Sequence, residues 1–305
     1  MKNKIALIGI GSGWGAPDQR TAKGPSVVIE FLKEKHPSIK YTLDYFHDDD
    51  LLPSMAIKPF DDHELRCQKL KFVFDCLTSR VKTAISDGYF PIVIGGDHSL
   101  AIGTWIGVSD ALNQKDFSLL WFDAHMDAHT IETSESMAPH GMPVSALLGF
   151  GYDEWTKKNK NTHAIIKPEN LYQFGIRSYE VGEAALLSQN KVHIDYVEDC
   201  KAKGLSVCMQ NIMSQLKTPL YGISIDIDAF DPEFAPGTGT VEPNGLDPND
   251  LLAFLADAGN NKRCILVEIM EFNPEKDVNN KTLSWISRFI EVLMGKNEEV
   301  MNDVK

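Results

Sequence analysis

The sequence predicts an α/β fold built around a mainly parallel sheet, and two observations lead to this prediction. Short apolar runs that favour strands alternate with longer helical patterns almost throughout the 305 residues. Several of the short runs are apolar at consecutive positions, which is typical of parallel strands covered by helices on both faces. The chain shows no internal repeat and no low-complexity linker, so we expect one domain spanning residues 1–305.

Eight segments are expected to form strands, and helical patterns lie between them. In chain order the expected strands are Ile5–Ile10, Tyr41–Tyr45, Phe90–Ile94, Ser118–Phe122, Leu171–Phe174, Val192–Tyr196, Leu220–Ile225 and Cys264–Val267. The helical patterns lie near Pro25–Glu34, His63–Asp87, Ser99–Ala111, Pro143–Leu148, Glu180–Leu187, Cys200–Met213, Pro248–Ala258 and Leu283–Met294. Because ligands bind beyond the carboxyl ends of the strands in open parallel sheets, we expect the chemistry at those ends.

Each end of the chain has its own sequence pattern. Lysines followed by Ile5–Ile10 could be mistaken for a secretion signal, but the apolar run is short and continues into glycine and polar residues without a typical cleavage site. A first strand is therefore favoured. The polar residues 297–305 are expected to form a mobile tail.

Composition excludes several classes of partner. The net charge of −13 argues against nucleic acid or an anionic membrane as the main partner. No apolar run approaches the roughly 20 residues needed to span a bilayer. The five cysteines are scattered and form no CxxC pair, which is typical of reduced thiols in the cytosol. We therefore expect a cytoplasmic protein that binds neither nucleic acid nor membrane.

The strand expected at Ser118–Phe122 runs into a segment rich in metal-binding side chains. An extended backbone turns alternate residues to one face, which here would group Asp123, His125, Asp127 and His129. Carboxylates and imidazoles gathered in this way would repel or stay unpaired unless a cation binds among them. Taken alone, the segment could equally be a solvated loop.

Two further strand ends favour the metal site. One ends in Asp97-His98, and the other ends in Asp226-Ile227-Asp228. The second could suggest a calcium loop, but residues 226–231 lack the glycine at the sixth position and the glutamate at the twelfth. The converging groups are two imidazoles and four carboxylates: His98, His125, Asp123, Asp127, Asp226 and Asp228.

Six such ligands are too many for one tetrahedral zinc ion, and none is a thiolate. Mixed nitrogen and oxygen ligands suit Mn²⁺ and similar divalent ions, and bridging carboxylates suit two ions about 3.5–4 Å apart. Two ions sharing a water would lower its pKa and present hydroxide near neutral pH. The sequence therefore predicts a hydrolase with a binuclear centre.

The chain resembles the arginase/agmatinase (ureohydrolase) family. The matching segments, in family order, are Gly95–Ser99, Asp123–Asp127, His140–Pro143, Ser224–Pro232 and Glu271–Pro274, with Gly24-Pro25 near the N-terminus. The resemblance implies a three-layer α/β/α domain with a central eight-stranded parallel sheet. It also implies two Mn²⁺ ions per chain and hydrolysis of a guanidino group to urea and an amine by a metal-bridging hydroxide.

The resemblance also implies roles for individual residues. The first manganese would be held by His98, Asp123, Asp127 and Asp226, and the second by His125, Asp123, Asp226 and Asp228. Asp127 would in addition orient the hydroxide. His140 would carry protons to the leaving amine, Glu271 would grip the substrate guanidinium, and Thr240 would line the site.

The spacing between the metal motif and His140 resembles arginases, so we expect L-arginine to be converted to L-ornithine and urea. The acidic residues Glu180 and Glu183 would then recognise the α-amino group, and Ser136 is retained from the loop that binds the α-carboxylate. His129 and Ala138 stand where that loop usually carries asparagines.

Around the α-amino pocket, Ser178 replaces an aspartate, and Glu180 is one methylene longer than the usual residue. Agmatine or another guanidino compound is therefore the alternative substrate. The resemblance also implies a homo-oligomer, either a trimer or a hexamer.

Two functions from other classes are less favoured by the sequence. Residues 11–16 fit the GxGxxA pattern of dinucleotide-binding enzymes, but Pro17–Arg20 do not continue as a good helix and the three metal-rich strand ends would be unexplained. A metal-binding relative without activity is disfavoured, because none of the six metal-binding positions is missing.

Overall fold

Eight parallel strands form one central sheet in the structure, a computed structural model that describes residues 4–37, 41–48, 63–156 and 164–295. The strand order is β2-β1-β3-β8-β7-β4-β5-β6, and every neighbouring pair is parallel. The strands are β1 Ile5–Gly11, β2 Thr42–His47, β3 Phe90–Ile94, β4 Ser118–Phe122, β5 Leu171–Ile176, β6 His193–Tyr196, β7 Tyr221–Asp226 and β8 Cys264–Met270. The predicted fold class is confirmed.

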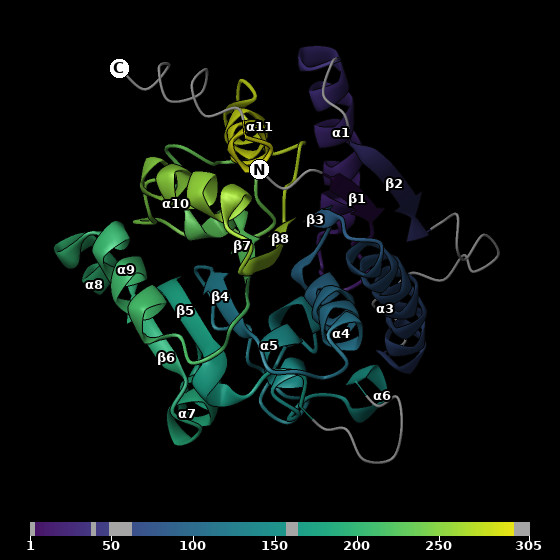
Figure 1. Cartoon of the computed structure of the whole chain (residues 1–305). Helices are drawn as coiled ribbons and strands as arrows, with labels where there is room; N and C mark the ends of the chain where they lie inside the picture. The colour runs from purple at the N-terminus through teal and green to yellow at the C-terminus, as the bar shows by residue number, and fades with distance from the viewer. Residues whose placement is uncertain (1–3, 38–40, 49–62, 157–163, 296–305) are drawn as a thin grey trace.

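Helices cover both faces of this sheet (Figure 1). One layer contains α1 Gly24–Lys35, α8 Val197–Lys203, α9 Leu205–Gln215, α10 Asn249–Asn260 and α11 Lys281–Leu293. The other contains α3 His63–Ser86, α4 Ala101–Ala111, α5 Pro143–Leu147, α6 Asp153–Thr156 and α7 Val181–Gln189. Short 3₁₀ turns are η1 Gln19–Lys23, η2 His98–Leu100, η3 Pro139–Gly141, η4 Pro168–Asn170 and η5 Ile227–Ala229. No helix among the described residues is both long and apolar enough to cross a membrane.

The strands are apolar at consecutive positions because each packs against both helical layers. In β4, Leu120 and Phe122 belong to the core beneath α10 and α11. Leu119 and Trp121, which alternate with them, belong to the core beneath α3 and α4. Every residue of this strand is buried. The two separate cores therefore explain the pattern from which a covered parallel sheet was predicted.

Some element boundaries differ from those expected. The helix predicted over Cys200–Met213 is two helices, because Gly204 adopts a positive φ of 86° and separates α8 from α9. The helix predicted from Ser99 starts with the 3₁₀ turn η2, and α4 proper begins at Ala101. Strand β8 continues to Met270, past the predicted end at Val267, because it pairs with both β3 and β7. The tail predicted at 297–305 lies outside the described residues.

The strand order brings together the ends that carry the metal-binding side chains. Strands β3, β8, β7 and β4 are consecutive in the sheet, although they are far apart in the sequence. Because all four are parallel, their carboxyl ends meet at one edge. The residues that follow β3, β4 and β7 therefore converge from three segments of the chain.

Core packing against β7 yields a stability prediction. A methyl group at Gly222 would overlap the Cζ3 and Cη2 atoms of Trp105, a fully buried ring. We expect Gly222→Ala to lower the free energy of unfolding by about 1–3 kcal/mol, as overpacked cores do. Urea unfolding followed by circular dichroism measures this change. Replacing the indole by a smaller ring should reduce the cost, so an equal loss in a Trp105→Phe background would contradict the overlap.

Candidate metal centre

The segment after β4 leaves the sheet in an extended conformation and then turns. The backbone N–H of Asp123 donates to Phe174 O at 3.1 Å, and His125 forms an isolated parallel bridge with Ser178. Asp127 then adopts a positive φ of 50°. Strand alternation therefore holds for Asp123 and His125 but ends at Asp127, before it could group His129 with them. Left-handed backbone at an aspartate is uncommon and is often found at functional sites.

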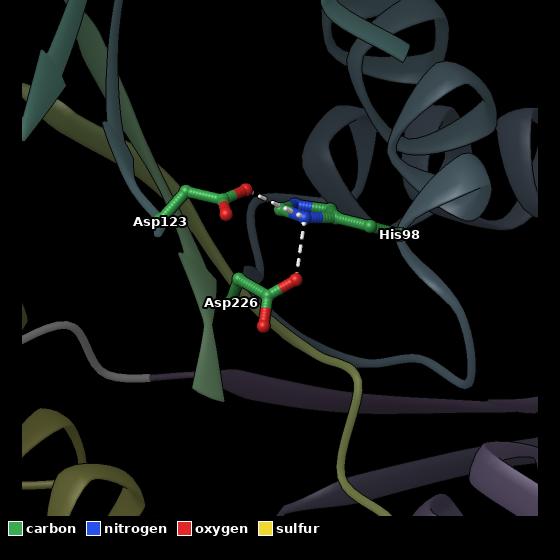
Figure 2. A group of neighbouring side chains, drawn as sticks. All are labelled: His98, Asp123 and Asp226. Carbon is green, nitrogen blue, oxygen red and sulfur yellow. Dashed lines mark hydrogen bonds and ion pairs between the residues drawn. The ribbon is translucent and has the colours of Figure 1, made fainter. Parts of the chain in front are cut away.

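Two groups of candidate metal ligands share Asp123. One consists of His98, Asp123 and Asp226, and the other of Asp123, His125 and Asp228, with ligand atoms within 4.8 Å of one another in each group. In the first group, His98 Nδ1 lies 3.0 Å from Asp226 Oδ2 and 3.2 Å from Asp123 Oδ2 (Figure 2). In the second, His125 Nδ1 lies 3.1 Å from Asp228 Oδ2. The shared carboxylate makes the two groups neighbours.

Asp127, the sixth predicted ligand, lies beside the first group. Its Oδ2 atom is 3.2 Å from His98 Nδ1. That oxygen is buried, meets no hydrogen-bond geometry, and shares the imidazole nitrogen with Asp123 and Asp226. A buried carboxylate oxygen that is only partly satisfied is costly, and a cation at this position would satisfy it.

Crowding of the carboxylates shifts their pKa values. Burial, reinforced by the charges of Asp228 and Asp123, raises the pKa of Asp226 well above its ordinary value. Burial and the charge of Asp123 raise the pKa of Asp127 to about 7. Both shifts mean that these side chains are held together against the repulsion of their ionised forms.

The imidazoles offset part of this repulsion. Burial alone would raise the pKa of Asp123, but hydrogen bonds from His125 and His98 outweigh burial and lower it. Burial lowers the pKa of His98, yet the surrounding carboxylates raise it well above its ordinary value. The imidazoles and carboxylates therefore stabilise one another's charged forms in this cluster. The nitrogen and oxygen donors, with no thiolate, fit Mn²⁺ or a similar ion.

A cavity of about 250 Å³ opens above the carboxylates. It is lined by every residue predicted for catalysis or substrate binding: Asp127, His129, Ser136, His140, Glu180, Glu183, Thr240 and Glu271. These residues come from the segments that follow β4, β5, β7 and β8. The structure therefore brings the predicted site together in one place.

The predicted catalytic pair, His140 and Glu271, is in direct contact. His140 Nδ1 lies 3.2 Å from Glu271 Oε1, and the same oxygen accepts the backbone N–H of His98 at 2.9 Å. Glu271 Oε2 is buried and makes no hydrogen bond. Burial would lower the pKa of His140, but the adjacent carboxylate of Glu271 raises it to about 9. Glu271 therefore lines the cavity and has one carboxylate oxygen that makes no hydrogen bond.

The outer wall of the cavity, which contains His129, Glu180 and Glu183, is acidic. His129 already contacts other protein side chains through both ring nitrogens. His129 Nε2 lies 3.2 Å from Glu183 Oε2, and its Nδ1 lies 3.2 Å from Thr133 Oγ1. The carboxylate of Glu183 is buried and also accepts the backbone N–H groups of Glu180 and Ala128. Glu180, by contrast, has a side chain that is 59% exposed. Among the described residues, none that line the cavity is Lys, Arg, Asn or Gln.

Two residues near the site were not singled out from the sequence. Glu242 Oε1 lies 3.5 Å from His125 Nε2 and accepts a hydrogen bond from Ser178 Oγ at 3.2 Å. Tyr179 lines the cavity. Glu242 lies in a loop with no hydrophobic period, so no pattern marks it. Tyr179 lies directly after the strand β5 and the motif containing Arg177, and its position past a strand end was the available signal.

Comparisons with known proteins agree with this geometry. The sequence model of the arginase family matches residues 3–295. An arginase from Bacillus caldovelox is 33% identical over 293 residues, which are 92% of this chain and 94% of that protein. The chain therefore belongs to the arginase family, which consists of hydrolases that act on linear amidines and use a binuclear metal centre.

Solved structures show the same fold. The crystal structure of arginase from Bacillus subtilis subsp. subtilis str. 168 matches with a TM-score of 0.85 and 28% identity, covering 97% of this chain and 100% of that chain. An Entamoeba histolytica arginase in complex with L-ornithine matches with a TM-score of 0.83 and 27% identity, again covering 97% and 100%. The three-layer arrangement of the sheet and its helices is thus that of arginases.

The contact between His140 and Glu271 yields a pH prediction. Because the pKa of His140 is raised from 6.5 to about 9, the pair stabilises the fold fully below pH 6.5 and loses its effect as pH rises through about 9. Glu271→Gln should bring the pKa of His140 down toward its ordinary range or below it. Titration of the imidazole by NMR measures the shift. Glu180→Gln, at an exposed position, is the control, and an unchanged His140 pKa in Glu271→Gln would contradict the coupling.

Proposed function

We propose that this protein is a manganese-dependent arginase that hydrolyses L-arginine to L-ornithine and urea. One observation supports the proposal most strongly: two groups of imidazole and carboxylate ligands share Asp123 at the base of a cavity whose wall contains His140 and Glu271. The names of its relatives also support it, since proteins about 30% identical over nearly the whole chain are arginases. One such relative has been solved with L-ornithine, the expected product.

The six predicted ligands fit two divalent ions. The first ion would be held by His98, Asp123, Asp127 and Asp226, and the second by His125, Asp123, Asp226 and Asp228. The buried Oδ2 of Asp127, which meets no hydrogen-bond geometry, and the repulsion among the buried carboxylates support this assignment. When bound, such ions lower the pKa of water and so provide a nucleophile near neutral pH.

The chain's own residues would supply binding and proton transfer. The free Oε2 of Glu271 accepts an N–H of the planar guanidinium, which orients its carbon toward the carboxylates. Asp127 Oδ2 orients the attacking water. Water adds to the guanidinium carbon, and the bond from that carbon to the substrate's Nε atom breaks. His140 gives that nitrogen the proton it needs to leave as the amine of ornithine, and the remaining fragment is urea.

The outer wall would recognise the amino-acid end of the substrate. Glu180 and Glu183 would bind the α-amino group, Ser136 and His129 would bind the α-carboxylate, and Thr240 would line the site; all five residues line the cavity. A second candidate substrate, agmatine or another guanidine without a carboxylate, is favoured by a specific observation. Both ring nitrogens of His129 already have protein partners, and the described lining contains no cationic lysine or arginine.

Family membership also supports two broader proposals. We expect a homo-oligomer, either a trimer or a hexamer, and a location in the cytoplasm. Light scattering coupled to size-exclusion chromatography would determine the number of subunits.

A substrate panel tests the proposed activity. With Mn²⁺ bound, L-arginine should release urea with a higher kcat/KM than agmatine or other guanidines. Arginine carries both the α-amino group and the α-carboxylate that the outer wall would bind. A higher kcat/KM for agmatine would favour the second candidate. Two bound metal ions with no hydrolysis of any guanidine would contradict the enzymatic proposal.

A single substitution tests the second ion's position. His125→Ala should reduce the metal content from two ions to one and lower kcat by at least about 100-fold, because the nucleophile requires both ions. Elemental analysis of purified protein and a urea assay measure the two effects. His193→Ala, which removes a half-exposed histidine on β6, is the control. Full metal content and near-normal turnover in His125→Ala would show that this imidazole is not a ligand.

A further inference from the structure

The loop that carries Ser136, residues 134–138, is held from behind by a buried arginine. Arg66 lies near the start of α3 and is 3% exposed, and its Nη2 atom donates to the backbone oxygen of Met137 at 2.6 Å. Arg66 is not among the described residues that line the cavity, whereas Ser136 and Ala138, on either side of Met137, both line it. A cation therefore lies directly behind this part of the cavity wall.

Met137 has a backbone conformation that needs such support. Its φ is 53°, in the left-handed region that residues other than glycine rarely adopt. A hydrogen bond from a guanidinium is about twice as strong as one between neutral groups, and burial strengthens it further. Arg66 belongs to a 24-residue helix that packs on the central sheet. Its contact with Met137 therefore anchors the turn to a rigid part of the fold.

The turn at Met137 also determines how two serine hydroxyls donate. Ser134 Oγ accepts the backbone N–H of Met137 at 3.1 Å, and Ser136 Oγ accepts that of Ala138 at 3.3 Å. The two hydroxyl oxygens lie 3.5 Å apart. When Ser134 donates across this distance, both lone pairs of Ser136 Oγ are occupied, and its own hydrogen is left for a ligand in the cavity. A hydroxyl that can only donate favours an anion over an ammonium group.

A second buried cation lies on the same side of α3. Lys69 follows Arg66 by three residues, which places the two side chains next to each other on the helix. Lys69 is 3% exposed, and its Nζ atom lies 3.6 Å from the centre of the Trp14 ring. The next residue, Gly15, accepts the backbone N–H of His140 at 3.1 Å. Both cations are therefore packed against segments that lead directly into the cavity wall.

We propose that Arg66 is a positioning residue that holds the loop 134–138 ready for a carboxylate, so that the site selects amino-acid guanidines over guanidines without a carboxylate. This inference rests on the proposed function and specifies the substrate class of the same site. Glu180 and Glu183 would bind the α-amino group, and the hydroxyl of Ser136, with the guanidinium behind it, would bind the α-carboxylate. Such an arrangement suits a zwitterion, because each charged group meets the opposite charge.

Kinetics with two substrates test the proposal. In Arg66→Met, kcat/KM for L-arginine should fall by about 10–100-fold, mainly through a higher KM. For agmatine, which has no carboxylate, kcat/KM should stay within about 2-fold of the wild-type value. The number of bound Mn²⁺ ions should not change. Arg80→Met is the matched control, because it removes another arginine of α3, one that pairs with Asp44 at 3.0 Å, and it should leave the preference for L-arginine intact.

Ligand binding provides a readout that needs no turnover. L-Ornithine and 1,4-diaminobutane differ only by the carboxylate. Calorimetry of the Mn²⁺-loaded protein should show that the wild type binds L-ornithine more tightly than the diamine, and that Arg66→Met does not. Arg66→Gln keeps a side-chain N–H without the charge, so it should show a smaller loss of the same kind and replaces Arg66→Met if that variant does not fold.

The two proposals fail in different ways. A wild-type preference for L-arginine and L-ornithine in a folded Arg66 variant would overturn the inference and leave the proposed function standing. A wild-type protein that hydrolyses agmatine in preference to L-arginine would overturn the proposed substrate. In that case equal affinities of the wild type for L-ornithine and 1,4-diaminobutane would overturn the inference as well, whereas tighter binding of L-ornithine that Arg66→Met abolishes would support it.

Discussion

The repulsion among buried carboxylates at one edge of the sheet is the constraint on which the rest of this structure depends. Asp123, Asp226 and Asp228 lie at the carboxyl ends of two adjacent strands, β4 and β7, and are almost fully buried. The parallel pairing of these strands holds the acids together, because moving one of them would break the ladder beneath it. The imidazoles of His98 and His125 relieve part of the repulsion. Divalent cations would relieve the rest of the repulsion. The arrangement of these acids at the strand ends therefore favours metal binding.

The same edge of the sheet contains strained backbone. Asp127 and Glu271 both have positive φ angles, 50° and 65°, although neither is glycine. Each follows a strand of the central sheet, and each has a buried oxygen without a hydrogen bond. Strain and unsatisfied acceptors at the same residues indicate that these side chains are held ready for a partner that the protein itself does not supply.

The deep and outer parts of the cavity are determined by different forces. At the base, charge and burial allow few arrangements, and the predicted ligands are found together. On the outer wall, His129, Glu183 and Thr133 satisfy one another through ordinary hydrogen bonds. Such contacts can be exchanged for contacts with a ligand at little cost, so they constrain the substrate weakly. The base of the cavity therefore determines the reaction chemistry more strictly than the outer wall determines which guanidine binds.

The sequence by itself determined the parallel sheet, its eight strands and the strand ends that carry the metal-binding residues, because doubly covered strands and alternating ligands leave local patterns. Only the tertiary structure decided what lies behind those residues. Glu268 is one charged residue in an apolar strand, and nothing local shows that β7 places Ser224 between it and His98. The turn at Asp127, which separates His129 from the ligands, depends likewise on contacts distant in the chain. Periodicity reports which face of an element is buried, whereas hydrogen bonds across strands depend on register and neighbours.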